Sequence, residues 1–589
     1  MTALDLNPAP PSPPQSGAEI RRSRFNGFLW SSRFASVVAV VAVLVPLAVM
    51  LIKVFMPDGT LDLEALSKVW AQPWLGSMLV DTLVTVFLGA CGALIVGALF
   101  AWINERTNAR LGWLGETLPV VPLFMPPLAS AIGWVLLGMP GPGVLNSILT
   151  TMLSWIGIDA GPEGPINIFS WPGVVFLFSV NLLPHVYLVV SAALRNLDPA
   201  LEEAARMNGS GPTATLWKVT IPAIKPAMIS GALLALAAGF ALFSVPFLIG
   251  TPAGVDNLTV RVVNMTTNAY PPALDEATVL GLVVVFLIGS TWLIQRRVNR
   301  LARHSTMTGK TSSPSRVDLG LLAWPARIVM IAYICAAVVL PAVALVFVSL
   351  QSYWTGKLTL DALSLEHYTR LFSPSSSTYA ALQNSIVLAI VTASIALLVT
   401  ALIAYYGERN PSSILGRVAD GVTKLPAALS HVVIAVALIV TLAGPPFGLQ
   451  GTLVLLLIGY LIMYLPQAGV AASSALAQIG PTMSEASLMS SASQGRTFRK
   501  VVLPLMAPGL VSGWVLVFVL TAGDLTASVM LSSPRTPVVG FVMLDLSTSG
   551  TYGVVAALGV IITLISATVG SLALAYGRRA RGGPRRNKE

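Results

Sequence analysis

Charged residues are scarce in this chain. Asp, Glu, Lys and Arg together make up 10% of its 589 residues, whereas hydrophobic residues make up 55%. Soluble domains carry about 25% charged residues, so a soluble globular protein is excluded. There are two cysteines, Cys91 and Cys335, and both lie in apolar stretches, which supports neither a disulfide framework nor a cysteine metal site. The alternating polarity of a membrane barrel is also missing, and backbone hydrogen bonding in lipid then leaves helices.

Chemical machinery is missing as well. The sequence has no Gly-x-x-x-x-Gly-Lys-Ser/Thr loop to hold nucleotide phosphates. It also has no clustered set of His, Asp and Glu, or of Ser and Lys, to supply acid–base or nucleophilic catalysis. We therefore predict that the chain is not an enzyme and binds no cofactor, so that any ATP is bound by partner subunits.

Long apolar runs are abundant. A helix needs about 20 apolar residues to cross a hydrocarbon core of about 30 Å. About twelve stretches meet this requirement, near residues 35–55, 79–103, 119–138, 173–194, 227–250, 277–295, 326–349, 383–405, 425–443, 452–474, 507–531 and 553–576. The sequence thus predicts an all-α polytopic membrane protein that is surrounded by lipid.

The basic residues lie mainly on one side of these stretches. Of the 35 Lys and Arg residues, 29 fall on the side that also holds both termini. The other six are Lys53, Lys68, Arg261, Lys357, Arg370 and Arg535. Cytoplasmic loops carry such an excess, so we expect a multi-pass protein of the cytoplasmic (inner) membrane with both termini in the cytoplasm. The net charge of +10 then reflects topology, and no nucleic-acid partner is expected.

The second half of the chain repeats landmarks of the first. Six pairs are separated by 282 positions: Pro184 and Pro466, Pro199 and Pro481, Glu203 and Glu485, Val219 and Val501, Pro222 and Pro504, and Pro226 and Pro508. Asp81-Thr82 and Glu105-Arg106 recur 303 positions later as Asn384-Ser385 and Glu408-Arg409. Because each half holds six spans, the halves are expected to form a parallel repeat about an axis along the membrane normal.

Composition sets the predicted domain boundaries. They are a disordered cytoplasmic tail at 1–34, a first six-helix domain at 35–296, a polar cytoplasmic linker at 297–325, a second six-helix domain at 326–577 and a basic cytoplasmic tail at 578–589. The first half carries 25 additional residues on the outer side, between its third and fourth spans. Residues 144–158 within this extension are expected to form a helix at the surface.

One cytoplasmic segment occurs in both halves. In the first copy, Asp198-Pro199 is a helix-start signal, because Asp caps free amides and Pro is tolerated at the first helical position. The run from Gly209 to Pro212 is expected to end that helix and start another. Glu202 and Glu203 are predicted to be available to solvent or to a partner. A helix, a turn and a second helix are therefore expected here.

The spacing of this segment resembles the signature loop of ABC importer permeases. That loop reads Glu-Ala-Ala, three residues, Gly, nine residues, and then an aliphatic-x-aliphatic-Pro run. The matching residues are Glu202, Glu203, Ala204, Ala205, Gly209 and Pro222 in the first copy, and Glu485, Ala486, Ser487, Ser491 and Pro504 in the second. The resemblance implies two coupling helices, each docking one copy of a cytoplasmic ATP-binding subunit. Since the second copy has Ser487 and Ser491 where the motif has Ala and Gly, damage at Glu203 is expected to cost more than damage at Glu485.

A closer resemblance is to the fused two-domain permeases of ferric-iron-type importers. It covers residues 74–577 and rests on Trp134 with 141–146, on 243–252 and on 523–528. It implies a pseudo-two-fold permease that receives its solute from an extracytoplasmic solute-binding protein. Permeases of the same type serve thiamine, phosphonate or polyamines, so these solutes stay open beside ferric iron. An ion-coupled secondary transporter is the alternative of a different class, since some of those also have twelve spans in parallel halves.

Four residues are candidates for the translocation path: Asp81, Pro246, Asp524 and Ser528. An Asp within a membrane helix costs about 2.5–3.5 kcal/mol on insertion scales and is therefore a functional candidate. Asp524 in the eleventh span is expected near an outer gate, with Ser528 and Asp81, where its carboxylate would favour cationic solutes. The alternative is a snorkelling or helix-bridging carboxylate.

The remaining polar groups in the spans have simpler explanations. Pro246 interrupts a helix and frees a carbonyl near Leu242 that could line a cavity, although a kink against neighbouring helices explains it equally well. His185 and His431 each lack a second ligand at suitable spacing in the sequence. Packing or hydrogen bonding is therefore expected of both, and no metal site is predicted.

Overall fold

The computed structural model describes residues 27–111, 121–122, 125–302, 316–354, 363–374, 376–479, 483, 485, 487, 489 and 493–581. The terminal segments 1–26 and 582–589 and residues 303–315 of the predicted linker lie outside these residues. Within the described part, regular structure is helical, and β pairing is limited to isolated bridges such as Thr107 with Val317. Residues 27–34, predicted to belong to the disordered tail, are helical instead, because Phe28 packs against the rings of Tyr405 and Phe498.

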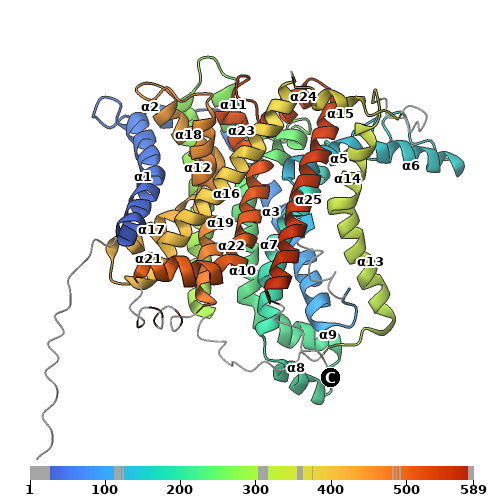
Figure 1. Cartoon of the computed structure of the whole chain (residues 1–589). Helices are drawn as coiled ribbons and strands as arrows, with labels where there is room; N and C mark the ends of the chain where they lie inside the picture. The colour runs from blue at the N-terminus through green and yellow to red at the C-terminus, as the bar shows by residue number, and fades with distance from the viewer. Residues whose placement is uncertain are drawn as a thin grey trace, which may run out of the picture.

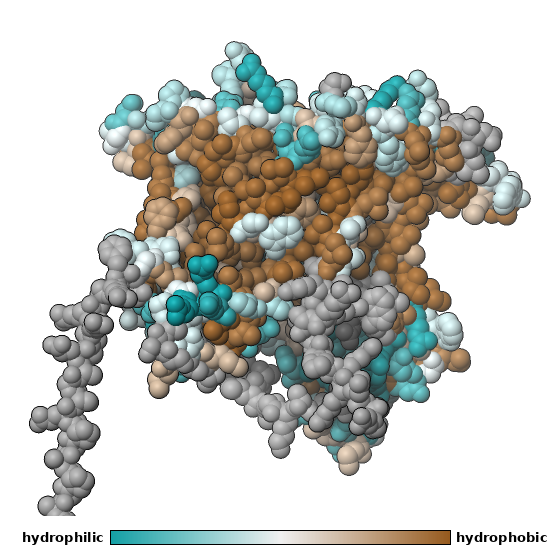
Figure 2. All heavy atoms as spheres, viewed as in Figure 1, coloured by the Kyte–Doolittle hydropathy of each residue, from teal (hydrophilic) through white to brown (hydrophobic). Residues whose placement is uncertain are grey.

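Ten helices of the described residues are long and apolar enough to cross a membrane. They are α1 (Gly27–Phe55), α3 (Trp74–Arg106), α7 (Trp171–Asn196), the run of α9 (Pro212–Thr215), η2 (Leu216–Thr220) and α10 (Ile221–Ala241), α12 (Leu274–Ala302), the run of η4 (Gly320–Leu322), α13 (Ala323–Ile334), η5 (Cys335–Val339) and α14 (Leu340–Ser349), α16 (Ser377–Arg409), α19 (Leu453–Ala477), the run of α21 (Gln494–Thr497), η8 (Phe498–Val502) and α22 (Leu503–Ala522), and α25 (Tyr552–Arg581). They stand side by side (Figure 1), and their side chains form an apolar belt between two polar ends (Figure 2).

The third span of each half departs from the prediction of twelve continuous helices. In the first half, α5 (Pro127–Gly138) has 12 residues. In the second half, α17 (Ile414–Lys424) and η6 (Leu425–Ala428) are followed by α18 (His431–Leu438) and η7 (Ile439–Ala443). The chain bends by 109° between these two pairs, so that together they make at most an eleventh span. Nearly all of α5 and all but the first residue of α18 are buried in protein. Because other helices shield them from lipid, they do not need the length of a lipid-facing span.

The fifth span of each half ends earlier than predicted. The expected helices 227–250 and 507–531 stop at Ala241 and Ala522 and are followed by short segments. These segments are η3 (Pro246–Gly250) and α11 (Leu258–Thr267) in the first half, and α23 (Thr526–Leu531) and α24 (Val539–Thr548) in the second. We name the intervening residues, 242–245 and 523–525, the first and second breaks.

Equivalent residues hold both segments that follow the breaks. The Leu258 amide donates to Thr82 Oγ1 at 3.1 Å, and the Val539 amide donates to Ser385 Oγ at 2.8 Å. Thr82 and Ser385 are partners in the repeat with a separation of 303. The repeat seen in the sequence is therefore a repeat in three dimensions.

The first helix of each half lies against the other half. α1 packs on α16, α17 and α18, where Lys53 Nζ donates to Val440 O at 2.8 Å and Thr441 Oγ1 donates to Pro46 O at 3.3 Å. α14 packs on α5 of the first half, Tyr333 Oη of α13 donates to Val180 O of α7 at 3.3 Å, and Trp134 Nε1 donates to Ala336 O of η5 at 3.1 Å. This exchange makes the two halves one interlocked unit, which the sequence pattern did not predict.

Short helices cover the two ends of the bundle. The predicted surface helix is present as α6 (Val144–Trp155), which projects from the end that also carries α2 (Glu64–Trp70), α11, α15 (Glu366–Leu371) and α24 (Figure 1). The helix of the first repeated segment, α8 (Pro199–Met207), lies at the opposite end. The two ends thus differ in what they present to partners.

Candidate functional site

The first repeated segment forms the predicted helix, turn and helix. The Ala200 amide donates to Asp198 Oδ1 at 3.0 Å, and Pro199 occupies the first helical position of α8. The helix ends at Met207, Gly209 takes a φ of +78°, and α9 begins at Pro212. The capping and breaking residues therefore act as the sequence indicated.

Gly209 yields a test of this turn. Replacing it by Ala places a Cβ in open space but forces an L side chain into the left-handed region, which costs about 1–2 kcal/mol. We expect Gly209→Ala to destabilise the turn after α8, so that amide hydrogen exchange in α8 rises about fivefold, the factor that about 1 kcal/mol carries. Gly211→Ala is the matched control, because Gly211 also faces open space but has a φ of −67°. Equal amide exchange in α8 of the two variants would contradict the strain argument.

The outer face of α8 combines apolar and acidic side chains. Leu201 is 51% exposed and Met207 is 89% exposed, and Glu203 and Ala204 lie on the surface beside them. Ala205 is half-buried, and Pro222 stands at the start of α10. Large apolar side chains at a polar end of a membrane protein mark an interaction surface.

Glu202 corrects the prediction that both acidic residues of α8 are available to a partner. It is 4% exposed and faces inward. Its Oε2 lies 3.5 Å from Arg106 Nη1, and Thr220 Oγ1 donates to its Oε1 at 2.7 Å. Arg106 Nη2 in turn donates to the carbonyls of Leu194 and Leu197 at 2.8 and 2.9 Å. Glu202 is thus an anchor that fastens α8 to α3, α7 and η2, because a carboxylate next to a guanidinium is satisfied in the interior.

The second repeated segment is only partly described. Glu485 is exposed, Ser487 is half-buried with its Oγ 3.0 Å from Thr497 Oγ1, and Pro504 is the second residue of α22. Ala486 and Ser491 lie outside the described residues. The counterpart of Glu202 in the repeat is Ser484, so the sequence offers no carboxylate to Arg409, the counterpart of Arg106. Nε and Nη2 of Arg409 are buried without a hydrogen-bond partner in the described part of the chain.

A cavity of about 270 Å³ lies between the two halves, within the apolar belt. Both breaks contribute to its wall, the first through Leu242, Phe243 and Ser244 and the second through Gly523, Asp524 and Leu525. Its polar lining residues are Asn181, His185, Ser244, His431, Tyr464, Gln467, Asp524 and Thr526. No Lys or Arg is among the residues that line it.

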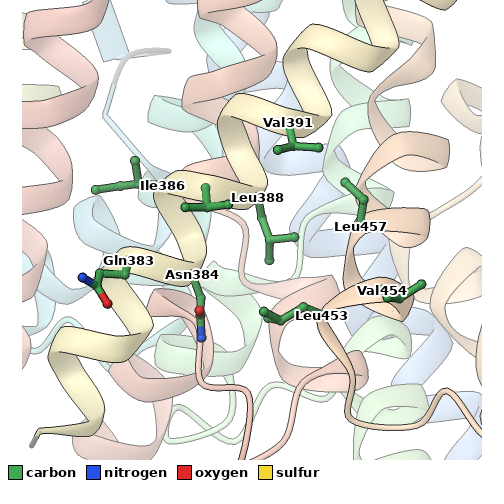
Figure 3. Close-up of a pocket in the computed structure, with 9 residues that line it drawn as sticks. Gln383, Asn384, Ile386, Leu388, Val391, Leu453, Val454 and Leu457 are labelled. Carbon is green, nitrogen blue, oxygen red and sulfur yellow. The ribbon is translucent and has the colours of Figure 1, made fainter.

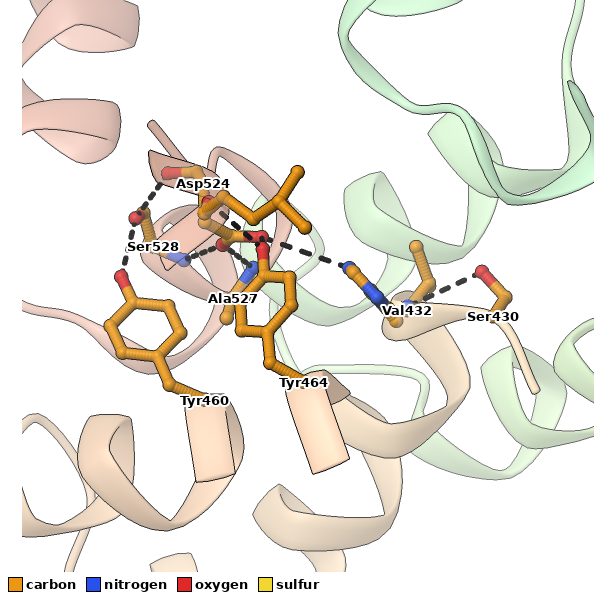
Figure 4. A network of polar contacts seen from close by, with 9 residues as sticks. Ser430, Val432, Tyr460, Tyr464, Asp524, Ala527 and Ser528 are labelled. Carbon is orange, nitrogen blue, oxygen red and sulfur yellow. Dashed lines mark hydrogen bonds and ion pairs between the residues drawn. The ribbon is translucent and has the colours of Figure 1, made fainter. Parts of the chain in front are cut away.

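Asp524 stands at the centre of a polar network on this wall (Figure 4). It follows the end of α22 and lies in the second break, not within a continuous helix as predicted. Its Oδ2 accepts from the amides of Ala527 at 2.8 Å and Ser528 at 3.3 Å, which caps α23. Its Oδ1 accepts from Tyr464 Oη at 2.8 Å and lies 3.7 Å from His431 Nδ1.

The other three residues predicted for the path do not line this cavity. Asp81 Oδ2 accepts from the Asp256 amide at 3.1 Å and holds the loop before α11. Pro246 starts η3, where it is buried beyond the first break. Ser528 donates to Asp524 O at 2.6 Å and lies 2.9 Å from Tyr460 Oη, so it supports the network from behind. Of the four, Asp524 is the residue that the structure places in the cavity wall.

Sequence spacing did not reveal His431, Tyr464 or Gln467 as partners in this site. His431 and Asp524 are 93 residues apart, and the side chains come from three elements: His431 from α18, Tyr464 and Gln467 from α19, and Asp524 from the second break. In the described residues, no three His, Cys, Asp or Glu side chains are grouped to hold a metal ion. Polar residues within apolar spans mark candidate site residues in the sequence. They do not show which of these side chains come together in the fold.

A second, larger hollow has a different character. It measures about 570 Å³ and lies between α16 and α19, lined by aliphatic residues with Gln383 and Asn384 (Figure 3). Val387 and Val454 in its wall are 56% and 53% exposed, so the hollow opens toward lipid. Asn384 Nδ2 is already engaged, donating to Pro537 O at 2.8 Å. An open, largely aliphatic groove offers little to hold a polar solute.

Two interlocked halves of like topology, a polar cavity between them and an exposed helix at one end define a polytopic membrane permease. The chain belongs to the family of binding-protein-dependent transport system inner membrane components, whose family model matches residues 93–303 and again residues 396–582. It is thus a fused permease with two copies of the family domain.

Relatives support this membership. The chain is 23% identical over 533 residues to the ferric transport system permease protein FbpB of Actinobacillus pleuropneumoniae, covering 88% of this chain and 74% of that protein. It is 28% identical to the probable ABC transporter permease protein y4fN of Sinorhizobium fredii, over 63% of this chain and 69% of that protein. The molybdenum transport system permease protein ModB of Escherichia coli is 27% identical over 39% of this chain and 94% of its own length. That protein therefore corresponds to less than half of this chain.

Proposed function

We propose that this chain forms the transmembrane path of an ABC importer for ferric iron. In this proposal, an extracytoplasmic binding protein delivers the solute, and two copies of an ATP-binding subunit dock on α8 and on the segment around Glu485 at the cytoplasmic end. Both termini lie in the cytoplasm. The observation that carries the proposal is the pairing of an exposed, partly apolar helix α8 with a polar cavity between the halves.

Two further features support iron as the solute. The ferric permease relative aligns over most of the chain, whereas the molybdenum relative aligns over less than half of it. The cavity also presents the Asp524 carboxylate with no Lys or Arg in its wall. A site of that charge favours a cation over an oxyanion such as molybdate.

Apolar contacts on α8 provide the first test of docking. Leu201→Glu combined with Met207→Glu places charges on an exposed face, so the fold should remain intact. ATPase subunits should then fail to co-purify, because the new carboxylates would be buried without partners in the docked complex. Leu321→Glu is the matched control, since Leu321 is 90% exposed but lies outside α8. Undiminished co-purification of the double variant would contradict docking at α8.

Charge reversal tests which of the two repeated segments contributes more to ATPase-subunit docking. Changing both Glu203 and Glu485 to Lys should abolish co-purification of the ATPase subunit. Of the single variants, Glu203→Lys should lose more, because α8 is fastened by the Arg106–Glu202 pair and the second segment has Ser484 at that place. A quantitative pull-down of each single variant checks the order, and equal losses would contradict it.

A further inference from the structure

The network around Asp524 contains a set of atoms that could bind a metal cation. Asp524 Oδ1, Tyr464 Oη and His431 Nδ1 come from the second break, α19 and α18, and all three residues line the central cavity. Oδ1 is 2.8 Å from the phenol oxygen and 3.7 Å from the imidazole nitrogen. Ligands about 2.0–2.2 Å from one ion lie at comparable distances from each other. Asp524 Oδ1 is therefore spaced from each of the other two atoms as two ligands of one ion are.

The rest of the network holds these atoms in place. The two amides at the start of α23 engage Oδ2 and leave Oδ1 directed at the cavity. Tyr464 Oη also lies 3.1 Å from Leu520 O, which fixes the phenol at the edge of the second break. The His431 and Tyr464 rings pack edge to face at 5.4 Å between centroids. A ligand set held by its neighbours is a feature of metal sites.

Charge in the cavity also points to a cation. Asp524 is 7% exposed, and His431 is the basic side chain that faces it in the described part of the chain. A buried carboxylate without a strong cationic partner is costly. Gln467 Oε1, from the same cavity wall, is buried and lacks a hydrogen-bond partner among the described residues. The cavity thus presents one unsatisfied acceptor, Gln467 Oε1, together with the Asp524 carboxylate, to whatever enters it.

We propose that Asp524, Tyr464 and His431 form a transient binding site for a transition-metal cation, Fe³⁺, as it crosses the membrane. This inference rests on the proposed function and adds that the cargo passes as the cation itself, bare or partly hydrated, and not as an anionic chelate. Carboxylate, phenol and imidazole suit iron. When Fe³⁺ binds, an iron–oxygen bond forms to Tyr464 and the phenol proton passes to water in the cavity. Iron keeps its oxidation state throughout.

Three protein ligands leave the remaining coordination positions to water. A transit site must be weak enough to release its ion, and an incomplete ligand set meets that need. The cavity of about 270 Å³ far exceeds the roughly 10–15 Å³ that one water requires, so a partly hydrated ion fits. His185 and Asn181 line the same cavity from α7 of the first half and are placed to contact that hydration shell.

The test uses the purified full-length chain in lipid nanodiscs, with Fe³⁺ supplied as its nitrilotriacetate complex. Bound iron is measured after dialysis, and the visible phenolate-to-iron charge-transfer band reports whether a tyrosine oxygen is a ligand. We expect the wild type to retain iron and to show the band. Tyr464→Phe should abolish the band, and Tyr464→Phe, Asp524→Asn and His431→Gln should each weaken retention by about 10–100-fold.

Tyr460→Phe is the matched control. Tyr460 lies one turn before Tyr464 in α19, is equally buried and bonds Ser528, but it does not line the cavity. Its variant should keep both the band and the iron. The inference is overturned if the wild type retains no more iron than empty nanodiscs, or if the band survives in Tyr464→Phe. The wild type and each variant are also tested for co-purification of the ATPase subunit. A variant that loses iron but keeps the ATPase subunit supports this site, whereas a wild type that does not co-purify with the ATPase subunit would overturn the proposed permease function.

Discussion

Arg106→Met should uncouple the transporter while Arg409→Met leaves it close to wild type. Arg106 is 1% exposed, and its guanidinium holds Glu202 and two carbonyls of α7. Removing one partner of a buried ion pair costs about 3–5 kcal/mol, because the other charge stays buried and unpaired. The fraction of molecules that hold α8 in its docked position should therefore fall by about a hundredfold or more, since about 1.4 kcal/mol corresponds to a factor of ten.

The repeat supplies the control for this prediction. Arg409 is the counterpart of Arg106 in the repeat, but the sequence has Ser484 at the position of Glu202, so the equivalent ion pair cannot form. Its loss strands no carboxylate of the docking segment. Solute-stimulated ATPase activity of the assembled complex measures both variants. Adding Glu202→Gln to Arg106→Met should restore part of the activity, because the stranded charge is removed. Similar losses for Arg106→Met and Arg409→Met, or no rescue by Glu202→Gln, would contradict the anchor.

Gly540→Ala should destabilise the second break and impair uptake. A Cβ on Gly540 would lie 2.2 Å from Asp524 O and 2.8 Å from Ser528 Cβ and Oγ. Backbone at that distance must move, and overpacking of this kind costs about 1–3 kcal/mol. The displaced atoms carry Asp524, so uptake per folded molecule should fall together with the melting temperature in detergent.

Two comparisons make the Gly540 prediction specific. Since Leu258 corresponds to Val539, Thr259 is the counterpart of Gly540 in the first half. Thr259 Oγ1 donates to Leu242 O at 3.3 Å, so the first break accommodates a side chain at this position. Gly289→Ala in α12 faces open space and should melt like the wild type or slightly above it. A Gly540→Ala protein with unchanged melting and uptake would show that α24 does not press on the second break.

Local signals in the sequence predicted the parts of the molecule that local forces determine. Asp198, Pro199 and Gly209 each act on their own backbone, and α8 begins and ends where they indicated. The long spans followed from apolar length, and the internal repeat followed from residue pairs at fixed separation. The family match to residues 93–303 and 396–582 confirms the prediction of a fused permease with two family domains.

Contacts between distant segments were not predictable in the same way. Hydrophobic length does not say that α1 lies against the second half, because lipid and protein are equally apolar neighbours. Gly523 alone was a weak sign of the second break. The cavity cluster joins His431, Tyr464 and Asp524 from three elements, and nothing in their spacing distinguishes ligands from packing residues. The prediction that Glu202 is available to a partner was wrong because Arg106, which pairs with it, lies 96 residues earlier in the sequence.

Uptake by proteoliposomes that contain the chain, its ATPase subunit and its binding protein tests the central claim most directly. Radioactive iron is supplied on the binding protein outside, and ATP is enclosed with the ATPase subunits inside. The account predicts uptake that requires enclosed ATP and continues when an ionophore collapses the proton gradient. Uptake that persists without any ATPase subunit and stops when the gradient is collapsed would show an ion-coupled transporter and contradict the account.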